Sequence, residues 1–404
     1  MIVNDVAHLC GYFSVKNREF HDQLPERWNP VIYEVNDIQA AGQYYYHEFV
    51  DLCMNQVKGY QCVLDEDISV NLRGGRTHKV HLDRMNLYFY PFGIVLFSVD
   101  ISQKDVELSD ALQALALMRN ITASDLSSIS EFENSVLKPM KEVCALTGNP
   151  AENFSLMECG NKLKIFHSVV CDESKTEEEL STILFGAGTL AVYDENDPMS
   201  FSKDYYESIM SSGRLSVFRN WKALGLLDTF TIVAEEIKEY MLEIWSEDYF
   251  RKIYLYTLFM KFLHFRINKD FREGVRSIKS IRKEITLFDT NYAYPKISYN
   301  FLPVEFYRIM VQGLDIEEEK AKITEKVNEE KDRREAEVGD KMNLFLGVIT
   351  CLTLFSAIWD FSCLMDGLFV FGDSIGTVTG VRACTMVIIS AICFVALLIR
   401  RASR

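Results

Sequence analysis

Short apolar runs and helical spacings are mixed over the first half of the chain, which predicts an α+β head over residues 1–228. Residues 86–90 and 94–101 are apolar-rich and flank the turn sequence Pro91-Phe92-Gly93, so they predict a β-hairpin. Residues 162–170 predict another strand. Helical spacing predicts three helices, in residues 108–118, 130–146 and 177–185.

The pattern then becomes almost wholly helical over residues 229–341. Residues 229–245 and 248–273 have amphipathic spacing, and the aromatic residues of the second segment favour a helix–helix core. Residues 300–340 predict a long stalk helix that is polar except for a thin apolar stripe, formed by Ile316, Ile323, Val327 and Val338. Such a helix needs partners along its stripe, and we expect it to continue directly into the segment that follows.

Two apolar runs without charged side chains, residues 342–359 and 383–399, predict a membrane domain over residues 342–404. At about 1.5 Å per residue, each run nearly crosses a hydrocarbon core of about 30 Å. We expect both termini in the cytoplasm of a multi-pass inner-membrane protein and the connection, residues 360–382, outside. The orientation follows from basic residues beside the spans: Lys341, Arg400, Arg401 and Arg404. Arg382 is the one basic residue that opposes it.

Composition narrows the function classes. The 404 residues include 58 acidic and 43 basic side chains, a formal net charge of −15, which disfavours direct nucleic-acid binding. The ten cysteines contain no CxxC pair, so we expect reduced thiols in a cytoplasmic head. No HExxH occurs, and we predict that the protein is not an enzyme. His78, His81 and Asp83 lack a further ligand at a metal spacing and are interpreted as loop charges.

Two basic clusters in the head are candidate ligand sites. In residues 71–79, paired glycines would let the backbone approach a phosphate held by flanking guanidinium groups; the alternative is a hairpin turn with solvated charges. In residues 211–229, an indole would stack on an adenine beside basic groups; the alternative is a helix whose aromatic residues pack in the core. The candidate ligand-binding residues are Arg73, Arg76, Arg214, Arg219, Trp221 and Lys222.

One face of the first apolar run carries small and polar residues at a spacing of three and four. The candidate pore-lining residues are Asn343, Leu346, Thr350, Thr353, Ala357 and Asp360. Symmetric copies would present these side chains to a water-filled pore, with a carboxylate ring at its outer mouth that attracts cations. The alternative is close packing between helices, which small residues also favour.

The chain resembles the CorA family of divalent-cation channels. Residues 300–307 (NFLPVEFY) are similar to the start of that family's stalk helix, and residues 339–343 (GDKMN) to the point where the helix meets the membrane. The resemblance implies a homopentamer in a lipid bilayer, with a central pore and Mg²⁺ as a candidate ion. The Gly-Met-Asn signature that forms the family's outer selectivity site is absent, and residues 357–362 read AIWDFS instead.

A CorA-like group without that signature comprises the membrane effectors associated with type III CRISPR systems, which this chain also resembles. The resemblance implies a channel or effector gated by a nucleotide messenger, an adduct of S-adenosylmethionine and AMP, in antiviral defence. We expect this ligand between the head and the helical region, near residues 214–222. The alternatives are a divalent-cation (Mg²⁺/Co²⁺) transporter with a variant selectivity filter and a membrane-anchored scaffold without a pore.

Overall fold

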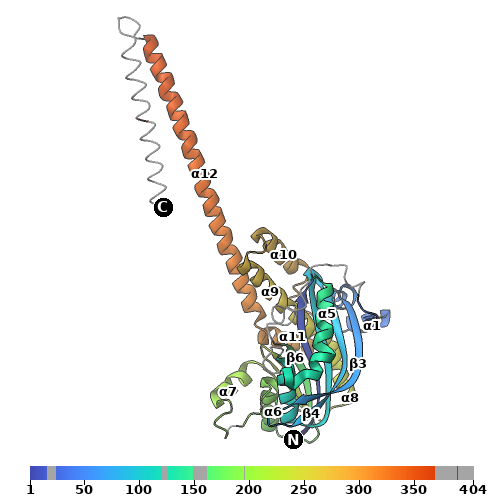
Figure 1. Ribbon diagram of the computed structural model, residues 1–404. Coiled ribbons are helices and arrows are strands. Elements are labelled where there is room, and N and C mark those ends of the chain that lie inside the picture. Colours follow the sequence, from blue (N-terminus) through green and yellow to red (C-terminus); the bar gives the residue numbers. More distant parts are fainter. Residues whose placement is uncertain (16–23, 121–125, 149–161, 195, 369–388, 390–404) are drawn as a thin grey trace. The chain divides into compact units, whose positions relative to one another are not determined.

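The computed structural model describes residues 1–15, 24–120, 126–148, 162–194, 196–368 and residue 389 (Figure 1). The chain divides into two compact units, Met1–Thr324 and Glu325–Arg404. The first unit is an α+β head built on one β-sheet, and the second begins inside the long helix α12 (Ile316–Leu368). The second predicted span, residues 383–399, except residue 389, and the end of the predicted outer loop lie outside the described residues.

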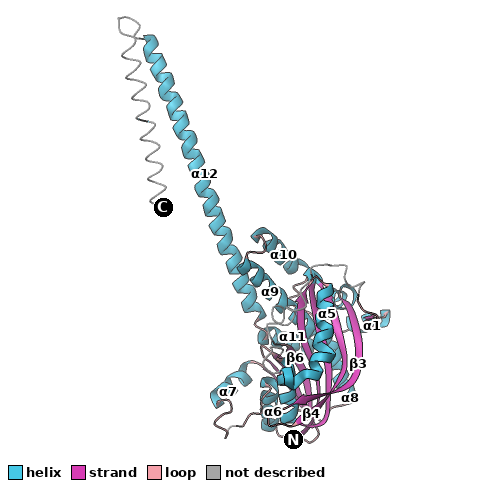
Figure 2. Ribbon diagram, viewed as in Figure 1, coloured by secondary structure: helices cyan, strands magenta, loops and turns pink. Residues whose placement is uncertain are grey.

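In the described part of the head, nine strands form one sheet (Figure 2). Neighbouring strands are antiparallel except β6 and β9, which are parallel. Strand β1 lies near the middle, so both of its faces are buried. In spatial order the strands are β2 (Asn29–Val31), β3 (Lys58–Asn71), β4 (Thr77–Tyr90), β5 (Ile94–Glu107), β1 (Ile2–Ser14), β6 (Lys164–Cys171), β9 (Thr229–Glu235), β8 (Trp221–Gly225) and β7 (Arg214–Leu215).

Helices from the first half of the chain cover one face of the sheet, and α5 crosses this face in Figure 1. Alternate residues of β1, including Val3, Ala7 and Leu9, point into the apolar core between this face and its helices. The layer contains α3 (Leu108–Arg119), η4 (Leu126–Ile129), α4 (Ser130–Phe132), η5 (Glu133–Leu137), α5 (Lys138–Leu146), α6 (Glu177–Thr189) and α7 (Lys203–Ser212).

The opposite face of the sheet packs against aromatic side chains of the later helices. The rings of His8 and Phe250 stack with centroids 3.9 Å apart, and Tyr12 stacks on Phe262 at 4.2 Å. The predicted helix–helix core over residues 248–273 therefore packs largely against strands. This layer contains α8 (Glu239–Ile244), the π-helix η8 (Trp245–Tyr254) and α9 (Leu255–Glu273), with α1 (Val35–Gly42), α2 (His47–Asp51) and η2 (Leu52–Gln56) nearby in the fold.

Helix α11 (Phe301–Gly313) is fixed on the sheet by Phe306, which is fully buried. The ring of Phe306 lies 4.1 Å from that of Tyr249 and 5.8 Å from that of Trp221, measured between centroids. At the end of α11 a side chain is sterically excluded, because a Cβ on Gly313 would lie 2.7 Å from the backbone carbon of Gly225. The preceding helix in the chain is α10 (Ile278–Asn291).

Most of the predicted elements of the head are confirmed. The hairpin is formed by β4 and β5, joined by the short turn η3 (Pro91–Gly93), and the strand predicted at residues 162–170 is β6. The three predicted helices correspond to α3, to the run from α4 to α5, and to α6. These elements were predictable because turn residues flank the hairpin and the helices have apolar residues at helical spacing.

The helix predicted at residues 229–245 is wrong. Residues Thr229–Glu235 form strand β9, and only Glu239–Ile244, within α8, and the following π-helix are helical there. The sequence TFTIVAE is rich in β-branched residues and is buried on both faces between β6 and β8. A continuous apolar run of this length fits either a buried strand or a buried helix, so its spacing did not separate the two.

The long helix predicted from residue 300 is broken once. Asp315, with a left-handed φ of +53°, turns the chain between α11 and α12. Helix α12 then runs without interruption through the predicted boundary at Met342, as expected. Residues 360–368, the start of the predicted outer connection, are helical and contain no Pro or Gly before Gly367; the boundary between span and connection stays a prediction.

We predict that Phe306→Ala lowers the free energy of unfolding of the head by about 3–5 kcal/mol, because it leaves a cavity between α11 and the sheet. The matched control is Phe301→Ala in the same helix, whose side chain is 64% exposed. The control should change stability by less than about 0.5 kcal/mol. Urea unfolding of the full-length protein in detergent, followed by tryptophan fluorescence, measures both. Equal effects of the two substitutions would contradict this packing.

Candidate functional site

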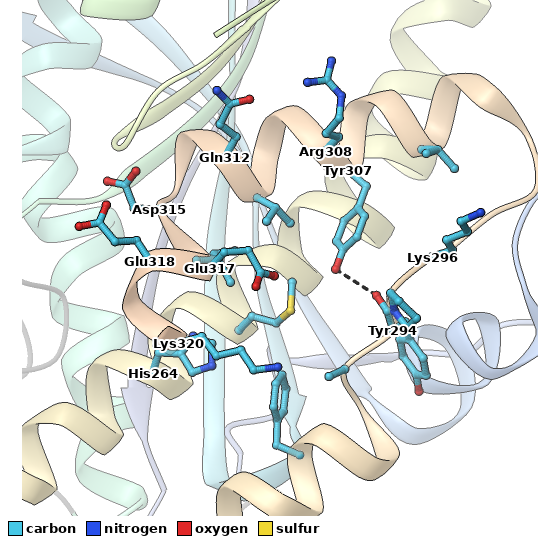
Figure 3. Close-up of a pocket in the computed structure, with 17 residues that line it drawn as sticks. His264, Tyr294, Lys296, Tyr307, Arg308, Gln312, Asp315, Glu317, Glu318 and Lys320 are labelled. Atoms are coloured by element: carbon cyan, nitrogen blue, oxygen red, sulfur yellow. Dashed lines mark hydrogen bonds between the residues drawn. The ribbon is translucent and has the colours of Figure 1, made fainter. Parts of the chain in front are cut away.

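The head contains an open cavity of about 720 Å³ between α9, α10, α11 and the first turns of α12 (Figure 3). Small-molecule sites in proteins have volumes of roughly 300–1,000 Å³, so this cavity is large enough for a nucleotide-sized ligand. All residues that line it belong to the unit Met1–Thr324. We therefore treat it as the candidate ligand site.

The cavity has an aromatic and apolar interior, with Phe288, Tyr294 and Tyr307 among its lining residues. The hydroxyl of Tyr307 donates a hydrogen bond of 3.2 Å to the carbonyl oxygen of Tyr294, which Figure 3 shows across the cavity wall. Burial raises the pKa of Tyr294 to about 12 and that of Tyr307 to about 12. Both phenols are therefore neutral near pH 7, and their rings offer surface to a flat apolar group.

Charged side chains of both signs border this interior. In Figure 3, Glu317 and Lys320 extend towards the centre from the first turns of α12, while Lys296 lies on the opposite side. The Lys320 ammonium pairs with the Asp289 carboxylate of α10 at 2.7 Å. In the part of the chain that the structure describes, Lys296 and Glu317 form no ion pair. The cavity therefore contains a cation and a carboxylate that a ligand can pair with directly.

His264 lines the cavity from α9 and is only 4% exposed. Its Nδ1 atom is buried and has no hydrogen-bond partner among the described residues. Burial and the nearby Lys320 ammonium lower the pKa of His264 to about 4, so the ring is neutral near pH 7. An unpaired polar atom in the interior is unfavourable, so the neutral form of this ring is the less costly one to bury.

The first turns of α12 are bound to the head by charge as well as by apolar contacts. The Lys261 ammonium of α9 donates to the carbonyl oxygen of Leu314 at 2.8 Å and to the Glu319 carboxylate at 2.7 Å. Ile316 and Ile323 are buried. A molecule in the cavity would therefore contact the anchored start of the same helix that continues to Leu368.

The predicted residues of the segment 211–229 divide into two kinds. Arg214 and Arg219 are exposed, on β7 and on the loop before β8. Trp221 is 3% exposed and packs on the rings of Trp245 and Phe306, so it belongs to the core. Lys222 is 1% exposed, and its ammonium donates to the Glu177 carboxylate at 2.9 Å. The segment forms strands, so the alternative of a helix is wrong. That alternative expected Phe218 and Trp221 in the core: Trp221 is buried there, whereas Phe218 is 46% exposed.

Arg73 and Arg76 lie in the turn between β3 and β4, with Gly74 and Gly75 at φ of +86° and +77°. The Arg76 guanidinium pairs with Asp110 at 2.8 Å, and this geometry is that of a hairpin turn with solvated charges. Five strand spacings of about 4.8 Å separate β4 from β8, a distance of about 24 Å. The two predicted basic clusters therefore do not form one site. Their separate roles in ligand binding stay predictions.

The three residues interpreted as loop charges lie on strand β4 instead. His78 is buried and hydrogen-bonded to the Gln103 side chain at 2.7 Å, whereas His81 is partly exposed and pairs with Asp67 at 2.8 Å. The two histidines are three residues apart on a strand, which places them on opposite faces of the sheet. Among the described residues no group of three or more His, Cys, Asp or Glu side chains is arranged to hold a metal ion.

The predicted pore-lining residues all lie on α12: Asn343, Leu346, Thr350, Thr353, Ala357 and Asp360. Among the described residues, one helix is long and apolar enough to cross a membrane, Ile316–Phe361, and none of its most apolar window is buried. The Thr350 hydroxyl donates to the carbonyl oxygen of Leu346 at 2.8 Å, and that of Thr353 to Thr350 at 2.9 Å. These hydroxyls are satisfied without a second helix. Their exposure to a pore stays a prediction.

Sequence reasoning missed the residues that form the cavity: His264, Tyr294, Lys296, Tyr307, Glu317 and Lys320. They come from three helices and a connecting loop, and no fixed spacing links them. The sequence contains two weak indications of a site here. His264 is the one histidine of an aromatic-rich helix, and Lys296 follows Pro295 in a short connection. Only the folding of α9 against α11 and α12 brings these signals together.

We predict that the free energy of unfolding depends on His264 between pH 4 and pH 6.5. The folded pKa of about 4 lies below the unfolded value of about 6.5, so the unfolded chain binds more protons in this window. The stabilisation is complete above pH 6.5 and is lost as the pH falls towards 4, by up to about 3 kcal/mol. Unfolding curves of the wild type and His264→Gln across this range measure the difference. Parallel pH dependences would show that His264 does not titrate in this way.

Comparisons with known proteins add no relative to this picture. No protein-family model, no curated protein and no solved structure matches the chain. The resemblance to CorA-like proteins, which depends on residues 300–307 and 339–343, stays a prediction. The function is therefore argued from the cavity and from the helix that leaves it.

Proposed function

We propose that the protein is an oligomeric membrane channel or effector whose head binds a small nucleotide-like ligand and whose α12 helix connects that event to the membrane. The observation that carries this proposal is the continuity of α12. Its first turns border the ligand-sized cavity, and the same unbroken helix contains the apolar segment able to cross a membrane. A ligand in the cavity therefore acts on one end of a membrane-crossing element.

Oligomerisation is supported by the surface of α12. The stripe residues Ile316, Ile323 and Val327 are buried, whereas Val338 is 60% exposed. The apolar residues of the span are exposed in the single chain, as lipid-facing and partner-facing residues would be. We propose a homopentamer, as the CorA resemblance implies, in which the face from Asn343 to Asp360 lines a pore.

Gating then follows from a difference in affinity. A ligand shifts the equilibrium between closed and open arrangements only if it binds one of them more tightly. The ion pairs Lys261–Glu319 and Lys320–Asp289 hold the start of α12 to α9 and α10 in the present arrangement. A ligand that alters either pair changes the relative free energy of any arrangement in which α12 is displaced.

The CorA-like effectors of type III CRISPR systems supply the biological setting that we propose. Their messenger, an adduct of S-adenosylmethionine and AMP, is of a size and chemistry that a cavity of about 720 Å³ with aromatic and charged lining accommodates. The absence of Gly-Met-Asn from the chain favours this setting over ordinary Mg²⁺ transport. We propose that the second span, residues 383–399, completes a multi-pass inner-membrane protein with both termini in the cytoplasm.

We predict that the full-length protein in planar lipid bilayers conducts ions after addition of the S-adenosylmethionine–AMP adduct to the side of the head. Thr350→Leu and Thr353→Leu should reduce the single-channel conductance several-fold, because larger apolar side chains narrow and dry a pore. The matched control is Val348→Leu, which adds a similar volume to the opposite side of the helix.

Native mass measurement in detergent tests the assembly independently, and a monomer or dimer would contradict the proposed pentamer. Messenger-dependent conductance that both threonine substitutions leave unchanged would move the pore away from this face. Mg²⁺-dependent growth rescue of a transport-deficient strain, without any response to the messenger, would favour the transporter alternative. Absence of conductance under every condition would leave a membrane-anchored scaffold as the better account.

A further inference from the structure

We propose that the first turn of α12 recognises an aminopurine nucleotide in the cavity. The Glu317 carboxylate would bind one end of the ligand, and the Lys320 ammonium would bind the other. This inference rests on the ligand-gated function proposed above and specifies the ligand class of its site. It follows from three features of the cavity: its aromatic interior, its opposite charges on one helix turn, and its ion pair to α10.

The aromatic interior of the cavity favours a ligand that contains a flat ring. Tyr307, Tyr294 and Phe288 line it, and the hydroxyl of Tyr307 is already occupied by the carbonyl oxygen of Tyr294. The aromatic surface that remains is suited to a stacked base, which every purine supplies. His264 adds a neutral ring with an unpaired, buried Nδ1 atom on the same wall.

The charged side chains of α12 determine which polar groups the ligand should carry on its ring. Glu317 and Lys320 are three residues apart on α12, so they lie on the same side of the helix, and both extend into the cavity in Figure 3. An ionised carboxylate only accepts hydrogen bonds, so Glu317 favours a ligand with an amino group. An ammonium only donates, so Lys320 favours an anion such as a phosphate. Lys296 on the facing wall adds further positive charge.

The ion pair to α10 supplies the effect on α12. Lys320 is bound to Asp289 at 2.7 Å, and both side chains are partly exposed. A phosphate that pairs with Lys320 competes directly with Asp289. Binding would therefore weaken one of the two ion pairs that hold the start of α12 to the head, while Lys261–Glu319 remains. The ligand would in this way favour arrangements in which α10 and α12 are separated.

The test measures binding of AMP, IMP, adenosine and inorganic phosphate to the full-length protein in detergent by calorimetry. We expect saturable binding of AMP, and at least tenfold weaker binding of adenosine, which lacks the phosphate, and of IMP, which lacks the amino group. Lys320→Gln should weaken AMP binding by about tenfold or more and leave adenosine unaffected, because a charge-assisted hydrogen bond is lost. Glu317→Gln should remove the preference for AMP over IMP.

Matched controls exist on the same helix. Lys331→Gln and Glu325→Gln change residues outside the cavity and should leave AMP affinity unchanged. Asp289→Asn removes the competitor of the phosphate without touching the cavity lining. It should tighten AMP binding by about two- to fivefold, as expected for release of a partly exposed ion pair. A purely structural role of Lys320 would instead predict weaker binding in both the Lys320 and the Asp289 variants.

No saturable AMP binding at millimolar concentration would overturn the inference, as would inorganic phosphate competing as well as AMP. Equal losses in the cavity variants and their controls would overturn it also. Its failure is distinguishable from failure of the proposed function. AMP binding that follows the expected pattern, in a protein that never conducts, contradicts only the channel. Messenger-evoked conductance that Glu317→Gln and Lys320→Gln leave unchanged contradicts only this site.

Discussion

The contact between Gly313 and Gly225 is the constraint on which the arrangement of the later helices depends. A Cβ on either residue would come within 3 Å of the backbone of the other helix or strand, so α11 can approach β8 only through two glycines. Phe306 lies about two helix turns before Gly313. It fills the space between α11 and the aromatic residues of the sheet and of η8. Because α11 is held at both points, the turn at Asp315 and the start of α12 have fixed positions against α9 and α10. The cavity is the space that this geometry leaves.

The buried ion pair at the start of α12 fixes the position of this helix against α9 but contributes little net free energy to folding. Lys261 is almost fully buried and its ammonium donates to two acceptors, whereas the Oε2 atom of its partner Glu319 is buried and accepts no hydrogen bond from the described residues. Desolvation of a buried ion pair offsets most of its Coulomb attraction, but removal of one partner leaves an uncompensated charge. The pair therefore disfavours other positions of α12 more than it stabilises this one. Such an element suits a helix that is expected to have two arrangements.

The sequence predicted the helices and strands whose formation depends on residues that are close together in the chain. The β4–β5 hairpin is marked by the turn sequence Pro91-Phe92-Gly93, and α3 and α6 by apolar residues at helical spacing. The uninterrupted course of α12 was predictable because its sequence contains no proline. Strand β9 was missed because its short apolar run fits a buried strand and a buried helix equally and no turn sequence beside it decided between the two. Trp221 was proposed as a stacking platform because its basic neighbours suggested a ligand, whereas its burial depends on Trp245 and Phe306, which are distant in sequence. The cavity was not predictable for the same reason, since His264, Lys296 and Glu317 meet only in the fold.

The polar part of α12 indicates why the protein would need to assemble. Between the cavity and the apolar span, ion pairs one turn apart, such as Lys322–Glu318 and Arg334–Glu330, follow the helix. These pairs are exposed to solvent, and exposed pairs contribute little to stability and are screened by salt. Gly339 lies in the same stretch, and a glycine inside a helix is unfavourable compared with alanine. Local forces alone therefore leave this segment close to marginal, although any coupling between cavity and membrane requires it to stay helical. Neighbouring copies of the same helix, packed along a shared pore, would supply the missing stabilisation, so that in this proposal assembly and coupling have one physical origin.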